Sequence, residues 1–86
     1  MKYRVLWSPQ AEQRLESIIK RAAAPVEVVD ASQKIDWQLL SAPNSFGESR
    51  SDQLRIGFAE PLAVLFEVMD AVRTAIVSDV WRTDRK

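Results

Sequence analysis

The chemistry open to this chain is phosphate electrostatics by Arg and Lys, or acid–base work by Asp and Glu, because His and Cys are both absent. Their absence excludes a Ser–His or Cys–His nucleophile pair and an imidazole general base. Zinc and most other transition metals lose their favoured ligands as well. A magnesium or calcium site would need clustered carboxylates, and no acidic cluster here has a recognised spacing. We therefore expect no metal site and no cofactor.

The charges balance overall but not along the chain. Twelve basic and twelve acidic residues give a net charge of zero, so no global field attracts nucleic acid. Residues 1–24 are predominantly basic and residues 25–46 predominantly acidic. The C-terminal segment is basic again, with Arg82, Arg85 and Lys86. These three side chains could contact a nucleic acid or another target, or they could simply be a solvated terminus.

Size and composition indicate one small globular domain over residues 1–86. The chain is 47% hydrophobic and 28% charged, and independent domains rarely fall below about 50 residues. No apolar run reaches the roughly 18 residues of a membrane span, and the N-terminus lacks a signal-peptide pattern. We expect a cytoplasmic protein with no membrane partner, and the lack of cysteine is consistent with a reducing compartment.

The first half of the chain predicts a strand followed by a helical hairpin. Apolar residues alternate with others over residues 2–7, which is the period of a strand. Ser8 and Pro9 then form an N-cap and first helical position. That helix should end before Pro25, and a second helix should run from about Val26 to Leu40. Its buried stripe should be Val28, Ala31, Ile35 and Leu39.

The second half predicts a loop and an antiparallel meander. Residues 41–52 contain most of the turn-forming residues and are expected to be a loop. Alternating strands should follow at 54–58, 62–69 and 73–81, joined by short turns. The expected fold is therefore α+β, a two-layer β-α-α-β-β-β arrangement with the helical hairpin packed on a mainly antiparallel four-stranded sheet.

Both faces of the last two strands are apolar, which is one apolar face more than the helical hairpin can cover. We expect a partner to cover the second face, either another copy of the chain or a strand or helix of another protein. The alternative is that loop 41–52 and the C-terminal tail fold over it. Periodicity does not decide whether Trp7 and Trp81 lie on that face or in the core. The expected partner-interface residues are Trp7, Leu65 and Trp81.

The order and spacing of these elements resemble the RelE/ParE superfamily of toxin–antitoxin toxins. The resemblance covers almost the whole chain, from the Ser-Pro strand end and following helix at residues 3–18 to the helix end and loop at 40–47. It continues through LRIG at 54–57, VLFEV at 64–68 and IVSDVWR at 76–82. The resemblance implies a cytoplasmic toxin domain that is bound by a cognate antitoxin, of the kind associated with plasmid stabilisation.

Members of this superfamily act in two ways. RelE-type members cleave messenger RNA on the ribosome without metal, using basic residues on the sheet and often a C-terminal Tyr or His. ParE-type members inhibit DNA gyrase and are not nucleases. By the resemblance, Arg55 and Arg82 match two of the basic positions of the cleaving members and are the catalytic candidates. Arg55 should lie on the sheet face opposite the helices, where pairing with Glu67 or Asp79 would be the alternative to a phosphate contact.

The chain departs from the cleaving members at the remaining positions. Ala63 stands where the family usually carries an Arg, and residues 80–86 contain neither Tyr nor His. The sole tyrosine is Tyr3, in the first strand. Because general acid–base help is usually worth about 10²–10⁴-fold, we expect weak nuclease activity or none.

Three functional hypotheses follow. The first is a toxin-like protein that binds an antitoxin and, if toxic, acts on a target such as gyrase. The second is a divergent ribosome-dependent messenger-RNA endonuclease. The third is a non-toxic homodimerising or scaffold module on the same fold.

Overall fold

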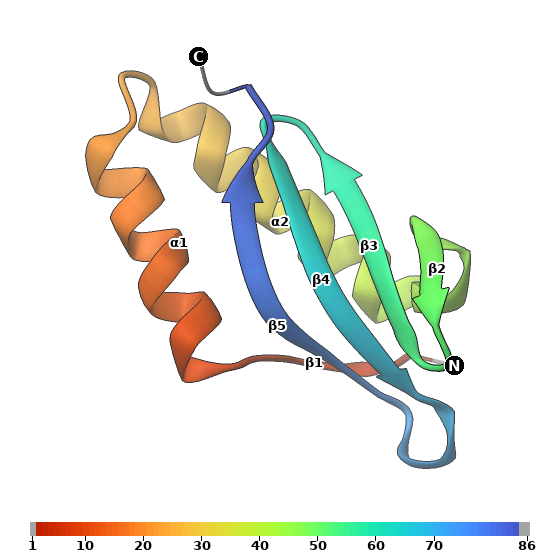
Figure 1. The fold of residues 1–86 in the computed structure, drawn as a ribbon. Helices are drawn as coiled ribbons and strands as arrows, with labels where there is room; N and C mark the ends of the chain where they lie inside the picture. The colour runs from red at the N-terminus through yellow and green to blue at the C-terminus, as the bar shows by residue number, and fades with distance from the viewer. Residues whose placement is uncertain (1, 85–86) are drawn as a thin grey trace.

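The computed structural model describes residues 2–84. A strand and two helices precede the main part of the sheet (Figure 1). In chain order, the elements are β1 (Arg4–Trp7), α1 (Pro9–Arg21), α2 (Pro25–Ser41), the 3-10 turn η1 (Pro43–Ser45), β2 (Glu48–Ser51), β3 (Leu54–Ala59), β4 (Leu62–Met69), the 3-10 turn η2 (Asp70–Val72) and β5 (Thr74–Arg82). Within residues 2–84, no helix has both the length and the apolar character that a bilayer span requires.

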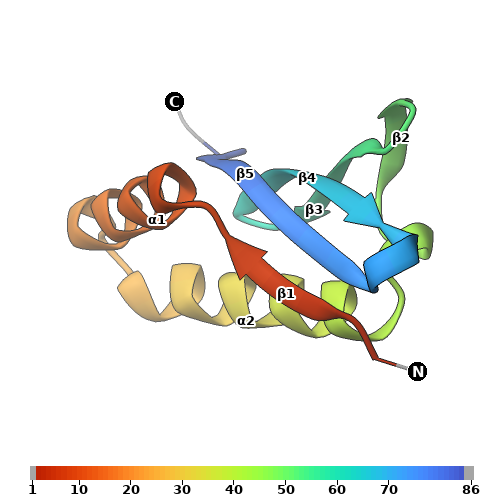
Figure 2. The ribbon, with the colours of Figure 1, turned by 90° about the horizontal axis from the view of Figure 1, so that it is seen from below.

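The sheet has the strand order β1-β5-β4-β3-β2. β1 pairs with β5 in parallel, and all other pairs are antiparallel. Helix α2 lies across one face of the sheet, while α1 runs beside β5 (Figure 2). Within residues 2–84 the opposite face carries no helix, and we call it the open face. The α+β arrangement of a helical hairpin on a mainly antiparallel sheet is confirmed.

The sheet has five strands rather than the expected four, because β2 forms within the segment predicted to be a loop. Its residues are Glu-Ser-Arg-Ser, and all four are exposed. A strand without apolar side chains gives no alternating pattern in the sequence. Its backbone pairing with β3 at the sheet edge is what holds it in place.

The first helix begins where the sequence predicts, and the second begins within one residue of its predicted start. The Ser8 Oγ accepts a hydrogen bond of 3.1 Å from the Ala11 N–H, and Pro9 follows as the first helical residue. Helix α2 begins at Pro25, one residue earlier than expected. Its predicted stripe is buried in full in the core, to which β4 and β5 contribute Leu62, Val64, Phe66, Val68, Ala75, Val77 and Val80.

The loop after α2 packs on the helix side of the sheet rather than over the open face. Phe46 is buried and stacks on Phe66 with 5.6 Å between ring centroids. Gly57 leaves room for this ring, since a Cβ there would lie 2.3 Å from it. The idea that loop 41–52 covers the second apolar face is therefore wrong.

A polar cluster joins the start of β1 to the two 3-10 turns. The Tyr3 hydroxyl donates to Asp70 Oδ1, and Asn44 Nδ2 donates to the same oxygen at 2.8 Å. The hydrogen bond from Tyr3, followed by that from Asn44, lowers the pKa of Asp70. The bond to Asp70 also raises the pKa of Tyr3. Each shift means that folding stabilises the protonation state present near neutral pH.

The Asp70 cluster should make stability depend on pH at both extremes. Asp70 stabilises the fold above its ordinary pKa of 3.8, and this is lost as the pH falls through the lowered value. Tyr3 stabilises it below its ordinary pKa of 10.0, and this is lost as the pH rises through the raised value. Between the lowered pKa of Asp70 and the raised pKa of Tyr3, the Tm of the wild type should therefore exceed that of Asp70→Ala. This difference in Tm should become smaller at lower and at higher pH. Asp30→Ala, at an exposed site on α2, is the control, and an unchanging difference in Tm for Asp70→Ala would contradict the prediction.

Candidate functional site

The structure separates the two arginines that the sequence brings together as catalytic candidates. Arg55 pairs with Phe66 on β4, whereas Arg82 pairs with Leu62. Four residues along β4 and two strand spacings lie between them, roughly 16 Å from Cα to Cα. Their guanidinium groups are hydrogen-bonded to different partners and do not converge on one phosphate.

Arg55 lies on the helix side of the sheet, so its predicted place on the open face is wrong. Cross-strand partners share a face, and its partner Phe66 is in the core. The guanidinium donates from Nε to the carbonyl oxygen of Phe46 at 3.0 Å and from Nη2 to that of Gly47 at 2.9 Å. Arg55 thus holds the loop before β2 against the sheet instead of presenting its charge to a ligand, and it forms an ion pair with neither Glu67 nor Asp79.

Arg82 closes β5 with its guanidinium held by a nearby carboxylate. Its Nε and Nη2 donate to the two carboxylate oxygens of Asp84 at 2.8 and 2.7 Å. These hydrogen bonds raise the pKa of Arg82, so it remains a cation at any physiological pH. The other two basic candidates, Arg85 and Lys86, lie outside the described residues.

The three predicted interface residues divide between the two sides of the sheet. Trp7 packs against the core on the helix side, and its Nε1 donates to Asp36 Oδ1 at 2.8 Å. Its predicted role in a partner interface on the open face is therefore not supported by its position. Leu65 and Trp81 do lie on the open face, since their cross-strand neighbours Ile56 and Ala63 point there.

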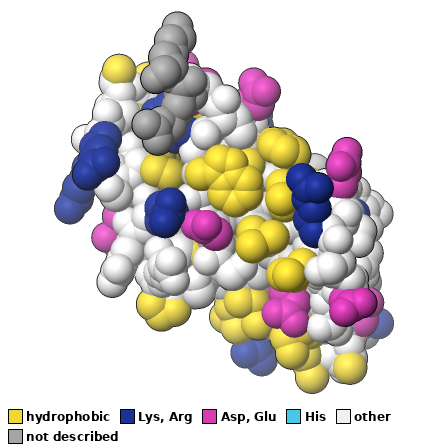
Figure 3. Space-filling model, viewed as in Figure 1, with side chains coloured by type: hydrophobic (Ala, Val, Ile, Leu, Met, Phe, Trp, Pro, Cys, Tyr) yellow, Lys and Arg dark blue, Asp and Glu magenta, His cyan; other side chains and the backbone are white. Residues whose placement is uncertain are grey.

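The open face carries an apolar patch across four strands. Leu6 on β1 is 45% exposed and Phe58 on β3 is 56% exposed, so both leave large apolar side chains in water. Hydrophobic side chains gather in the centre of this face, with basic and acidic groups around them (Figure 3). We define the open-face patch as Leu6, Ile56, Phe58, Leu65, Ile76 and Trp81.

A groove of about 760 Å³ runs between α1 and the C-terminal half of β5. Its polar and basic wall comes from α1 and its floor from the last residues of β5. The lining residues are Gln10, Gln13, Arg14, Ser17, Ile18, Arg21, Val80, Trp81 and Arg82. We call it the arginine groove. Because Trp81 also belongs to the open-face patch, the two surfaces are continuous.

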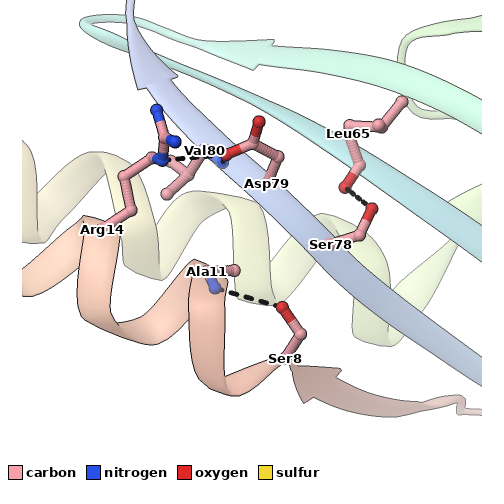
Figure 4. A network of polar contacts seen from close by, with 7 residues as sticks. All are labelled: Ser8, Ala11, Arg14, Leu65, Ser78, Asp79 and Val80. Carbon is pink, nitrogen blue, oxygen red and sulfur yellow. Dashed lines mark hydrogen bonds and ion pairs between the residues drawn. The ribbon is translucent and has the colours of Figure 1, made fainter.

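The floor of the arginine groove is a strand edge that β1 does not reach. β1 pairs only with residues 74–77 of β5, and the Ser8 N–H ends this ladder at the Val77 carbonyl. Beyond it, the β4–β5 register shifts opposite Leu65, which is a β-bulge. At this bulge, Asp79 Oδ1 accepts a hydrogen bond of 2.8 Å from the Val80 N–H and lies 3.1 Å from Arg14 Nε (Figure 4).

Sequence reasoning missed the arginine groove, although two signals were present. Arg14 and Arg21 are seven residues apart, so they lie on one face of α1. The apolar positions of β5 pass from Val77 to Val80, a step of three that indicates a bulge. Neither signal places α1 beside β5.

The site offers binding groups rather than a reaction centre. It combines cationic side chains, an apolar patch and free strand-edge backbone, but no acid–base pair aimed at a common point. Within the described part of the chain, no three carboxylates group together in a way that could hold a metal ion.

Solved structures of toxin–antitoxin systems share this fold. The RelBE2 complex from Mycobacterium tuberculosis has a TM-score of 0.79 at 15% identity, over 98% of this chain and 95% of that chain. The archaeal RelE–RelB complex from Pyrococcus horikoshii has a TM-score of 0.71 at 17% identity, over 100% of both chains. The chromosomal ParDE system from P. aeruginosa gives 0.69 at 20% identity, over 95% and 97%. No protein-family model and no curated protein matches the sequence. The chain therefore has a RelE/ParE-like fold.

Proposed function

We propose that this chain, which has a RelE/ParE-like fold, is the toxin-like component of a toxin–antitoxin pair and that its main property is binding a cognate antitoxin. The observation that carries the proposal is the open-face patch. A sheet with helices on one side only leaves these apolar side chains in water unless a partner covers them. The similar RelBE2 and RelE–RelB structures are toxin–antitoxin complexes, which supports an antitoxin as that partner.

The proposed activity is target binding of the gyrase-inhibitor kind, with weak nuclease activity or none. The two matched arginines lie roughly 16 Å apart by strand geometry, and each guanidinium is already hydrogen-bonded. The Tyr3 hydroxyl is bound to Asp70 beside the turn that precedes β5, at the opposite end of that strand from Arg82. Without a group that transfers protons, RNA cleavage that relies on phosphate stabilisation alone should be about 10²–10⁴-fold slower than cleavage with general acid–base catalysis.

The test is to express the chain in a bacterial host, alone and together with the product of an adjacent gene. We expect the two proteins to purify together and the second to relieve any growth arrest. Growth arrest with DNA damage and intact messenger RNA would support action on gyrase. Growth arrest with cleaved ribosome-bound messenger RNA would support the endonuclease hypothesis instead. A folded chain that binds no neighbouring gene product and causes no arrest would contradict the proposal and favour a homodimerising or scaffold module.

Substitution of both Arg55 and Arg82 by Ala should separate a structural role from a catalytic one. Because Arg55 holds two loop carbonyls, we expect Arg55→Ala to lower the free energy of unfolding by about 1–2 kcal/mol. Toxicity should survive in the double variant at temperatures where it is folded, and Arg55→Ala alone should leave antitoxin binding unchanged. The measurements are urea denaturation, co-purification and growth. Arg50→Ala, on exposed β2, is the control for loss of a surface charge. Loss of toxicity with the fold and antitoxin binding intact would instead assign the arginines to the reaction.

A further inference from the structure

The exposed backbone of β5 is the first element of a second binding surface. The Thr83 N–H donates to the Pro61 carbonyl, so Arg82 and Leu62 form a non-hydrogen-bonded pair in the antiparallel ladder. By the same alternation, the backbone groups of Val80 and Arg82 face away from β4 and toward the arginine groove. β1 ends before it reaches them, so no strand within residues 2–84 pairs with this edge. An extended segment lying in the groove would find hydrogen-bonding partners there.

Asp79 occupies this edge in the free chain. Its carboxylate accepts a hydrogen bond from the Val80 N–H and forms an ion pair with Arg14 (Figure 4). The Val80 N–H is one of the groups that an added strand would need. The side chains of Arg14 and Asp79 are 50% and 36% exposed. Ion pairs this accessible to water contribute little to stability, so a ligand can displace the carboxylate. Strand edges in natural proteins are commonly protected by bulges and charged side chains of this kind.

The charge of the groove selects the type of ligand. Arg14, Arg21 and Arg82 line it. Asp79 already pairs with Arg14 and Asp84 with Arg82, so within residues 2–84 the positive charge of Arg21 is the one that no carboxylate neutralises in the groove. The carboxylate of an acidic ligand side chain could take the place of the Asp79 carboxylate beside Arg14. A second copy of this chain fits poorly, because a symmetric edge-to-edge pair would bring the same arginines together. The complementary partner is therefore negatively charged and extended.

We infer that the arginine groove binds an extended acidic peptide segment, which adds to the free edge of β5 and displaces Asp79 from the Val80 N–H. This inference deepens the proposed function and rests on it, since the segment would belong to the antitoxin. Main-chain hydrogen bonds to the β5 edge supply affinity, and the arginines supply the preference for acidic side chains. Asp79 acts as an internal competitor that keeps the edge closed until the segment arrives.

The probe is a capped, fluorescein-labelled peptide of four Glu-Val repeats, compared with Gln-Val and Lys-Val peptides of equal length. Fluorescence anisotropy at low salt should show the acidic peptide binding at least about tenfold more tightly than either comparison peptide. Its affinity should fall as salt is raised. In ¹⁵N-labelled protein, the shifted amide signals should come from α1 and from the end of β5. N-methylation of alternate peptide bonds in the probe should abolish binding, because strand addition requires its N–H groups.

Two variants, each with a matched control, distinguish this surface from a general attraction to charge. Arg21→Glu should weaken binding of the acidic peptide at least about tenfold, whereas Arg50→Glu on β2 should leave it unchanged. Asp79→Ala should tighten binding, since the competing carboxylate is removed, and Asp30→Ala is its control.

Four outcomes would overturn the inference. They are equal binding of the neutral peptide, no binding of the acidic peptide at about 1 mM, weaker binding by Asp79→Ala, and tighter binding of a single-stranded oligonucleotide than of the acidic peptide. Co-purification of Arg21→Glu with the antitoxin at wild-type levels would also overturn it while leaving the proposed function standing. Failure of the wild-type chain to bind any antitoxin would instead contradict the proposed function.

Discussion

Replacement of Phe66 by Ala is expected to lower the free energy of unfolding by about 3–5 kcal/mol. The side chain is fully buried in the middle of β4, where it stacks on Phe46 beneath the helical layer. Removing the ring leaves a cavity that the stacked partner cannot fill without leaving its own place beside Gly57. In a chain this small, total stability is expected to be modest, so the variant should be largely unfolded at physiological temperature.

Phe58 is the matched control, because it is the same residue type on the neighbouring strand but 56% exposed on the open face. Phe58→Ala should cost less than about 1 kcal/mol, and its effect should appear in partner binding instead. Urea denaturation followed by circular dichroism measures both stabilities. Similar losses for the two variants would contradict the assignment of helix side and open face.

Replacement of Gly47 by Ala is expected to cost about 2–4 kcal/mol. Gly47 has a φ of +72°, and a Cβ there would lie 2.0 Å from the Ile56 carbonyl oxygen. That atom belongs to the backbone of a paired strand, so it cannot rotate aside as a side chain would. The loop must move instead, and the hydrogen bond from Arg55 to the Gly47 carbonyl is lost with it.

Ser49→Ala on the adjacent exposed strand is the control for Gly47→Ala, and it should change stability by no more than about 0.5 kcal/mol. Amide hydrogen exchange gives a local readout, since Gly47→Ala should lower the protection of β2 and the start of β3 more than that of β4 and β5. A Gly47→Ala variant as stable as the wild type would show that the turn tolerates an ordinary backbone conformation.

The sequence by itself determines both helices, four of the five strands and most of their boundaries. Ser8 and Pro9 start α1, Pro25 starts α2, and the stripe from Val28 to Leu39 faces the core as its spacing predicts. These are local properties of capping, ring geometry and helical periodicity, which require no knowledge of distant contacts. The excess of apolar residues on the last two strands is also visible in the sequence, and it predicts the open-face patch.

Only the tertiary structure decides which face of each strand the helices cover. In β3, Leu54, Ile56 and Phe58 look like the core-facing set, but they point to the open face. The small residues Gly57 and Ala59 face the helices, and the Phe46 ring fills the space above Gly57. Alternation divides a strand into two sets without saying which is covered, and this is why the predicted position of Arg55 was wrong.

The arginine groove is likewise a product of the tertiary structure. Arg14 and Asp79 are more than sixty residues apart in the sequence, and the parallel pairing of β1 with β5 brings them together. The shortness of β1 leaves the end of β5 unpaired, and the bulge turns Asp79 toward that edge. Sequence patterns report local periodicity, whereas a site between two elements depends on how the whole chain packs.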